Sequence, residues 1–317
     1  MLLRLSLSLS LLILLTSCKL MHLTTPHVQE EPQQGPITNF TRIQVIGNID
    51  VDLHTGNSNP GVSLHGDPQD VGQVKMYVTH GILRITLGED YPKFGRVHAD
   101  IRTHYMTAFA YKGKGNVIGD NIQAGYLDLL LANQGKAVLK GSMTLHHLTI
   151  MGSGYTKIDG IKGDELAIKM AGNPRVQLHG IIDMASLTVD GRGRLSMYWI
   201  KSDTLKIRAH GESFIQMAGI VQMLDMELWD QTRFNGKYLR GIRVFAKTHG
   251  EATADIAAVK RQHTLALDNS NIYYHEIPDM KTDFMGDNGS VLDLREWELP
   301  FMEEVTRYNR WTKRHCH

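Results

Sequence analysis

Leu127-Asp-Leu-Leu-Leu131 opens a repeat that decides the fold of this chain. Similar segments begin at Leu148, Leu166, Leu187, Leu205 and Leu224, and weaker copies begin at Val244 and Leu265. Successive segments start 18 to 21 residues apart, and apolar residues alternate with polar ones within each. Alternation with a period of two is typical of strands that bury one face. Such a strand can bury its apolar face by stacking on like units, so repeats of this length predict a solenoid.

The return leg of each unit reads as a second strand. Residues 175–179, for example, alternate as the first segments do, and each leg follows a turn rich in glycine or asparagine. These residues supply the positive φ that such turns need, whereas leucine-rich repeats usually return through a helix. We therefore expect an all-β, parallel β-helix whose coils of about 20 residues stack at about 4.8 Å. One dry column should contain the leucines that open four successive units: Leu148, Leu166, Leu187 and Leu205.

The composition fits one elongated domain or two. The chain has 317 residues, of which 42% are hydrophobic. Its formal net charge of +1 gives no electrostatic case for binding nucleic acid or an anionic surface. Two cysteines, Cys18 and Cys316, are too few for a disulfide framework. The glycine pairs of the repeat do not open a helix after a strand, so they predict corners and no nucleotide or other cofactor.

The first 18 residues read as a lipoprotein signal peptide. Arg4 precedes an apolar run from Leu5 to Leu15, which is too short to be a good membrane span. The run ends in Leu15-Thr-Ser-Cys18, which resembles the bacterial lipoprotein signal, so we expect acyl chains on Cys18 to anchor the protein to a membrane. A plain secretory signal with a chance cysteine is the alternative. Lys19 then implies the outer membrane, and the proline-containing segment 19–36 is expected to be a flexible tether.

Strand patterns begin at Ile37 and are less regular before Leu127 than after it. An irregular N-terminal sheet of this kind would hide the open edge of the first coil. Three stretches resemble the head GIN domain family: Phe40-Thr-Arg-Ile-Gln-Val-Ile-Gly-Asn-Ile-Asp-Val-Asp-Leu53, Gly61-Val-Ser-Leu-His-Gly-Asp67 and Gly81-Ile-Leu-Arg-Ile-Thr-Leu87. Members of this family of unknown function are named as auto-transporter adhesins. The resemblance covers about residues 37–275 and implies a right-handed β-helix in an envelope lipoprotein or secreted protein. It implies no active site.

These patterns place the β-helix domain at residues 37–280 and a tail at residues 281–317. In the tail, Pro300 opens a predicted helix that extends to about Lys313. Its acidic residues lie near the start and its basic residues near the end, as the helix dipole favours. We expect its apolar face to cap the last coil, and binding of a partner by this helix is the alternative. That face consists of Phe301, Val305 and Tyr308.

Aromatic residues of the C-terminal coils are the best candidates for ligand binding. One of two adjacent residues in a strand must face outward, and exposed rings can stack on sugars or on a partner protein. The alternative is that these rings fill the core or lie beneath the C-terminal segment. The candidates are Tyr198, Trp199, Trp229, Phe234, Tyr238, Tyr273 and Tyr274.

An enzyme on the same scaffold is a second interpretation. Parallel β-helices also serve polysaccharide lyases and hydrolases, which need paired acidic residues along one groove. Nothing in the sequence sets such a pair at a defined separation. The candidate carboxylates are Asp128, Asp190, Asp225, Glu227 and Asp230.

Histidines at three corners could line one edge of the stack, but a role in turns explains His179, His210 and His249 better than a metal site. We therefore expect no catalytic residue and no metal. The expected protein is an envelope-anchored, non-catalytic binding or structural module with an adhesin-like role. Its partners would be the membrane, through the lipid anchor, and a glycan or an envelope protein. A carbohydrate-active enzyme, or a subunit of an envelope assembly, is the alternative.

Overall fold

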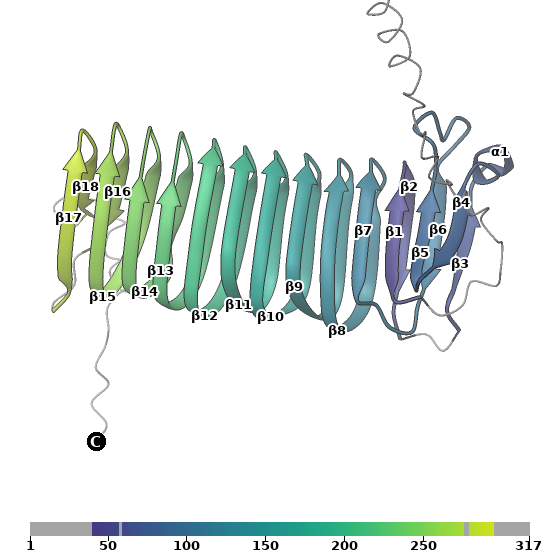
Figure 1. Cartoon of the computed structure of the whole chain (residues 1–317), viewed down its shortest axis with the longest axis horizontal. Helices are drawn as coiled ribbons and strands as arrows, with labels where there is room; N and C mark the ends of the chain where they lie inside the picture. The colour runs from purple at the N-terminus through teal and green to yellow at the C-terminus, as the bar shows by residue number, and fades with distance from the viewer. Residues whose placement is uncertain (1–39, 57–58, 276–278, 295–317) are drawn as a thin grey trace, which may run out of the picture. The chain divides into compact units, whose positions relative to one another are not determined.

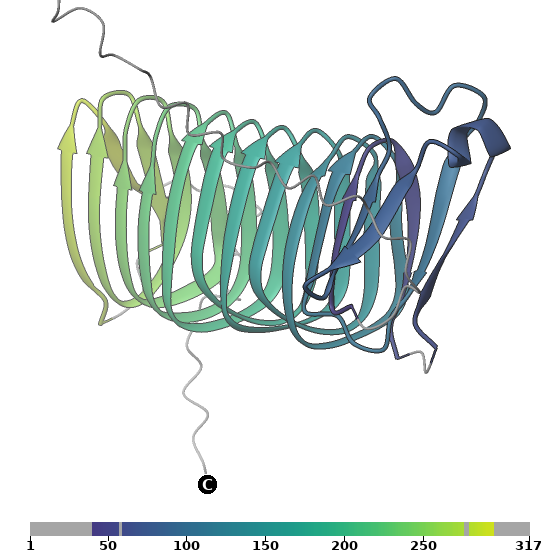
Figure 2. The ribbon, with the colours of Figure 1, turned by 45° about the vertical axis from the view of Figure 1, so that its right-hand side comes forward.

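The computed structural model describes residues 40–56, 59–275 and 279–294. Within them the chain is a β-solenoid of about nine turns, whose strands lie side by side from β7 to β17 (Figures 1 and 2). The predicted all-β class and the stack of short coils are confirmed. The signal peptide, the tether and the capping helix predicted at 300–313 lie outside the described residues.

Each of the strands β8 to β15 makes one coil. It bends at two corners, where the register shifts, and a short turn leads into the next coil, with which it pairs in parallel. The stretch before the first corner is called the opening arm and the stretch after the second corner the closing arm; in β10 these are residues 155–159 and 167–172. The bounds are β8 Val117–Asn133, β9 Lys136–Gly152, β10 Tyr155–Gly172, β11 Arg175–Gly191, β12 Arg194–Gly211, β13 Phe214–Leu228, β14 Arg233–Thr248 and β15 Thr253–Leu267.

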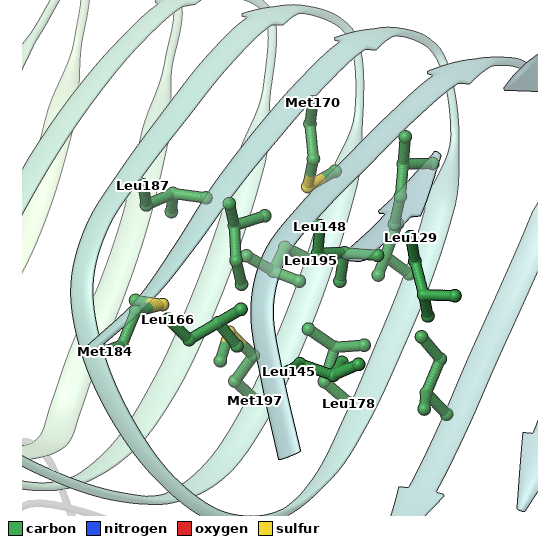
Figure 3. Packing of buried hydrophobic residues seen from close by; sticks show 14 of the residues in the cluster. Leu129, Leu145, Leu148, Leu166, Met170, Leu178, Met184, Leu187, Leu195 and Met197 are labelled. Atoms are coloured by element: carbon green, nitrogen blue, oxygen red, sulfur yellow. The ribbon is translucent and has the colours of Figure 1, made fainter. Parts of the chain in front are cut away.

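Side chains from successive coils stack in a dry interior (Figure 3). One column consists of Leu148, Ile168, Leu187 and Ile207, none more than 1% exposed. Leu166 and Leu205 are equally buried but lie opposite Met184 and Leu224, two residues ahead of that column. The prediction of a single leucine column is therefore wrong in alternate coils, while the dry stack is confirmed. A shift of two residues keeps the same face inward, so alternation alone cannot detect it.

Antiparallel strands close the N-terminal end. β1 and β2 lie in the second coil, because β5 and β6 pair with them in parallel on one side while β7 and β8 pair on the other. β4 and β3 then pair antiparallel with β5 and β6, as the irregular strand pattern predicts. The bounds are β1 Arg42–Ile46, β2 Ile49–His54, β3 Gly61–His65, β4 Lys75–Thr79, β5 Ile82–Thr86, β6 Val97–Arg102 and β7 Ala108–Gly113.

A buried carboxylate fixes the helical turn α1 (Pro68–Val71) at this end. The Asp70 carboxylate accepts backbone hydrogen bonds from Lys93, Phe94 and Gly95 at 2.8, 2.7 and 3.2 Å. Burial raises the pKa of Asp70, but the three hydrogen bonds outweigh it and bring the pKa below its usual value. The charged side chain thus joins two segments of the N-terminal cap.

The coils continue beyond the predicted domain boundary at residue 280. β16 (Asn271–Tyr274) and β17 (Lys281–Asp287) pair in parallel with β15, and β18 (Ser290–Asp293) pairs with β16. The tail predicted from residue 281 is therefore wrong up to residue 293. Phe284 lies in register with Thr264 of the inner column, yet it is 58% exposed, so the strand lacks the apolar alternation that marks earlier coils.

Candidate functional site

The residue at the first corner differs among three successive coils: it is glycine in β10 and β11 and tryptophan in β12. The opening arms end in register at Asp159, His179 and Tyr198. The residues that follow are Gly160, Gly180 and Trp199. At Gly160, φ is +86° and an added Cβ would overlap the carbonyl oxygen of Gly141 in the neighbouring coil. The stacked backbones therefore require glycine at this corner.

Trp199 takes the glycine position in the β12 coil. Its φ of +66° lies in the left-handed region, which costs a non-glycine residue about 1–2 kcal/mol. The side chain is 75% exposed, so burial of the ring does not offset the strain. Strained backbone of this kind gathers at functional positions, so Trp199 marks a candidate site.

An apolar row surrounds Trp199 on the surface. Ile181 in β11 is 72% exposed and Ile220 in β13 is 49% exposed, so three successive coils each present one large apolar side chain. All three line a groove of about 1160 Å³, which the rings of Tyr198 and Tyr238 also line. Grouped exposure of this kind is characteristic of binding surfaces, whereas single exposed apolar residues are ordinary.

Polar side chains complete the groove. Its lining includes Asp183, Lys201, Asp203, Gln222 and Arg240. The hydroxyl of Ser202, which is 5% exposed, accepts a hydrogen bond from the backbone N–H of Met184 at 2.8 Å and so ties β12 to β11. The groove can therefore hold a ligand that offers both an apolar surface and hydrogen-bonding groups.

The structure divides the seven predicted aromatic residues. Tyr198, Trp199 and Tyr238 line the groove. Phe234 and Tyr274 are core residues, 1% and 8% exposed, so their predicted role as ligand-stacking rings is wrong. Their registers explain the error: Phe234 lies between Ile215 and Ala254, and Tyr274 lies opposite Ile256, all inward positions. Tyr273 faces outward into a separate, smaller pocket of about 270 Å³.

Trp229 lies outside the groove, at the end of the closing arm. Its ring stacks between His210 and His249, whose ring centroids lie 4.0 and 5.5 Å from that of Trp229. His249 Nε2 lies 3.1 Å from Glu227 Oε1, and Lys247 Nζ lies 3.2 Å from the same oxygen. Burial raises the pKa of Glu227, but these hydrogen bonds and nearby positive charges outweigh it and bring the pKa below its usual value.

The five carboxylates predicted for an enzyme do not gather in the groove. Asp225 and Glu227 lie on the closing arm of β13. Their carboxylate oxygens are 3.1 and 3.7 Å from the guanidinium nitrogens of Arg208. Asp128 pairs with His147 at 2.9 Å. Asp190 is exposed beside a turn, and Asp230 accepts a hydrogen bond from the backbone of Gly211 at 2.8 Å, which is a structural role.

The sequence analysis missed two groove carboxylates, Asp183 and Asp203. A signal for them exists, because an aspartate follows the first corner by three or four residues in three successive coils, at Asp164, Asp183 and Asp203. The corner histidines do not converge: His179 Nδ1 lies 2.6 Å from Asp159 Oδ1, whereas the other two flank Trp229. Across the described residues, no three His, Cys, Asp or Glu side chains gather as metal ligands.

The fold and the groove define a β-solenoid with a hollowed, partly apolar corner. The family described as "Putative auto-transporter adhesin, head GIN domain" matches residues 39–197 and 142–278. The chain belongs to this family, as the resemblance of its N-terminal strands predicts. A search of curated proteins finds none that matches.

Solved structures with related folds include proteins of two Parabacteroides species. A "putative adhesin" of Parabacteroides merdae is 18% identical, with 81% of this chain and 92% of that chain covered and a TM-score of 0.49. A "putative lipid binding protein" and a "putative adhesin" of Parabacteroides distasonis are 16% and 15% identical, over 81% of this chain and 93% and 94% of theirs, with TM-scores of 0.45 and 0.48. At this level of similarity we draw no functional argument from them. Within the described residues, no helix has the length and apolarity that crossing a bilayer requires.

Proposed function

We propose that the protein is a lipid-anchored, non-catalytic binding module of the cell envelope, adhesin-like in role, whose Trp199 groove binds a surface protein. The observation that carries this proposal is the exposed ring of Trp199 on a left-handed corner where neighbouring coils have glycine. The strained backbone holds the indole outward without the flexibility of a loop. A rigid, exposed tryptophan beside other apolar side chains has the composition of a binding hot spot.

A protein partner suits the groove better than a glycan. Ile181 and Ile220 extend the apolar surface on both sides of Trp199, and aliphatic side chains gain most from burial against other apolar groups. The surrounding carboxylates and cations supply the polar rim that protein interfaces have. A glycan remains the other outcome of the test below.

The proposed lipid anchor is inferred from the N-terminal sequence. Cys18 follows directly on the apolar run, and acyl chains on it would hold the protein at a membrane, with Lys19 favouring the outer membrane. Segment 19–36 would then keep the domain off the bilayer. Cys18→Ser should move the protein from the membrane fraction to the soluble fraction, and mass spectrometry of the N-terminal peptide should show acyl groups on the wild type alone.

Adhesion can be measured with beads that carry the purified full-length chain on plates coated with mucin, which offers both protein and glycan. Wild-type beads should adhere, and Trp199→Gly should reduce adhesion by at least about tenfold, the size of a hot-spot effect. Phe94→Gly is the matched control, because Phe94 is an aromatic residue at the other end of the solenoid and 62% exposed. Equal adhesion of wild-type and Trp199→Gly beads would refute the role of the groove.

The two kinds of partner are separated by treating the plate before the beads are added. Protease digestion of the mucin should abolish adhesion if the groove binds protein. Periodate, which opens sugar rings that carry vicinal hydroxyls, should leave adhesion unchanged. The reverse pattern would identify a glycan ligand and contradict the choice of a protein partner.

A glycan-cleaving enzyme is the second candidate function, because Asp183 and Asp203 both line the aromatic groove. Glycoside hydrolysis needs two carboxylates across the scissile bond. Release of new reducing ends from mucin glycans by the wild type, and its loss in Asp183→Asn and in Asp203→Asn, would establish this activity in place of simple binding.

A further inference from the structure

A file of cationic and aromatic side chains follows one line of the solenoid, away from the Trp199 corner. The first residue of each strand from β9 to β14 faces outward, and the six residues pair in register from coil to coil. They are called the opening file. The opening file consists of Lys136, Tyr155, Arg175, Arg194, Phe214 and Arg233.

The cations of the opening file have no acidic partner. All four are exposed, and among the described residues none of their side chains makes an ion pair or a hydrogen bond. Arg175 and Arg194 lie directly opposite each other in adjacent coils, about 4.8 Å apart at their backbones. Like charges placed in this way repel, so the arrangement is unfavourable for the isolated fold.

Cations elsewhere on the same coils are arranged differently. Arg208, on the closing arm of β12, lies between Asp225 and Glu227, and Lys247 adds to the same network. Arg208 and Lys247 are therefore paired with acids on the closing arm, whereas, within the described part of the chain, the cations of the opening file are not. Glu212, which lines a hollow together with Arg194 and Arg233, is bound by Arg192 at 2.9 Å.

The rings of the opening file lie in the same line as its cations. Tyr155 separates Lys136 from Arg175, and Phe214 separates Arg194 from Arg233. A hollow of about 410 Å³ opens beside the second ring and is lined by Arg194, Phe214 and Arg233. An occupant of the file must therefore present anionic groups and flat, weakly polar surfaces in alternation.

We infer that the opening file binds an extended anionic polysaccharide that contains uronic acids, lying along the solenoid axis. A sugar ring has a face of C–H groups that stacks on the negative face of an aromatic ring, and a carboxylate fits the fork of a guanidinium. The length of one sugar residue in an extended chain is close to the spacing between neighbouring coils, about 4.8 Å. Successive sugars can therefore stay in register with successive coils over the six coils of the file. The file ends at Arg233, because Thr253 takes the next position and is flanked by Glu251 and Asp255.

A membrane surface and nucleic acid fit the opening file less well. A membrane would meet a flat patch of charge, whereas these cations form a single line. Double-stranded DNA carries one negative charge per about 1.7 Å of its axis, whereas the file offers at most one cation per coil spacing of about 4.8 Å. The net charge of +1 is a sum over the whole chain, so it does not describe this local row of cations.

The test measures binding of the full-length chain to polygalacturonate and to its methyl ester, which has the same sugars without the charges. The wild type should bind the charged polymer at least about tenfold more tightly, with affinity falling as salt rises. Replacing Arg175, Arg194 and Arg233 together by Gln should lower affinity about thirtyfold, because each exposed charge contact contributes roughly a threefold change.

Arg243→Gln is the matched control, since Arg243 is exposed on another stretch of the coil and without an acidic partner among the described residues. It should leave binding unchanged. Phe214→Ala should weaken binding of both polymers by a similar factor, because the ring contact does not depend on charge.

Three results would overturn the inference: equal binding of the acid and its ester, an equal loss in Arg243→Gln, or tighter binding at the same salt to single-stranded DNA or to phosphatidylglycerol vesicles. Trp199→Gly should leave polygalacturonate binding intact. Failure at the opening file and failure at the Trp199 groove are therefore separate outcomes.

Discussion

The corners of the β10 and β12 coils sit two coils apart in the same stack, yet one is glycine and the other is tryptophan. Gly160 is required because a side chain there would overlap a carbonyl oxygen of the neighbouring coil. Trp199 adopts the same left-handed sense of φ, with its ring 75% exposed. The first corner satisfies the fold alone, and the second departs from the rule at an energetic cost. This difference indicates that a function other than folding accounts for the tryptophan at the β12 corner.

The largest effect should come from placing a side chain at the glycine corner. Gly160→Ala should lower the free energy of unfolding by at least about 4 kcal/mol, because the atom that its Cβ would meet is backbone and cannot move aside. Urea titration followed by circular dichroism measures this change. Trp199→Ala is the control, since that corner already accommodates a Cβ, and it should change stability by less than about 1 kcal/mol. Similar losses in the two variants would show that the corners do not differ.

The two coils should nonetheless share one core. Leu205 in β12 and Leu166 in β10 are both 0% exposed, so Leu205→Asp should lose about 3–4 kcal/mol by burying an unpaired charge and should unfold the adjacent coils. Lys206→Gln, at the exposed neighbouring position, should have little effect on the melting temperature. A stable Leu205→Asp protein would mean that coil β12 differs from its neighbours in its interior as well as at its corner.

Relieving the backbone strain at the β12 corner should change the free energy of unfolding by a smaller amount, and should raise it. Trp199→Gly should raise the free energy of unfolding by about 0.5–1 kcal/mol, since removal of the left-handed strain exceeds the entropy that glycine adds to the unfolded chain. Thermal melts of the two proteins measure the difference. A gain in stability together with a loss of adhesion would assign the tryptophan to binding, whereas a loss of stability would indicate a structural role for the ring.

The sequence predicts the architecture better than the site. Alternation and spacing around Leu148 and Leu187 are sufficient to predict a stacked solenoid, because one buried face per coil leaves few other arrangements. The two-residue offset of Leu166 and Leu205 could not be predicted, since either register keeps a leucine inside. The side of the strand that Phe234 faces could not be predicted for a related reason: a turn of unknown length precedes it, and one residue reverses which side it faces.

The site itself depends on backbone geometry that composition does not reveal. Tyr198 and Trp199 were identified as an adjacent pair of which one must face outward, but the positive φ of Trp199 becomes visible only in the coordinates. The opening file could have been found, because Arg175, Arg194 and Arg233 each begin a return leg. It was missed because the net charge was summed over the whole chain rather than over positions that recur once per coil.

The smallest expected change in stability comes from an ion pair on the closing arm, away from the two corners. The pKa of Glu227 is below its usual value in the folded protein, so its contribution to stability is present above the unfolded-state pKa of about 4.3 and is lost as pH falls through the folded-state pKa. Glu227→Gln should therefore be less stable than the wild type by about 1 kcal/mol or less at pH 7. The difference should narrow and then vanish as the pH falls through the folded-state pKa, which chemical denaturation over a series of pH values down to a lower limit can measure. A difference that persists at the lower limit would mean that Glu227 acts through packing, because at that pH the carboxyl and the amide are both neutral and differ little in shape.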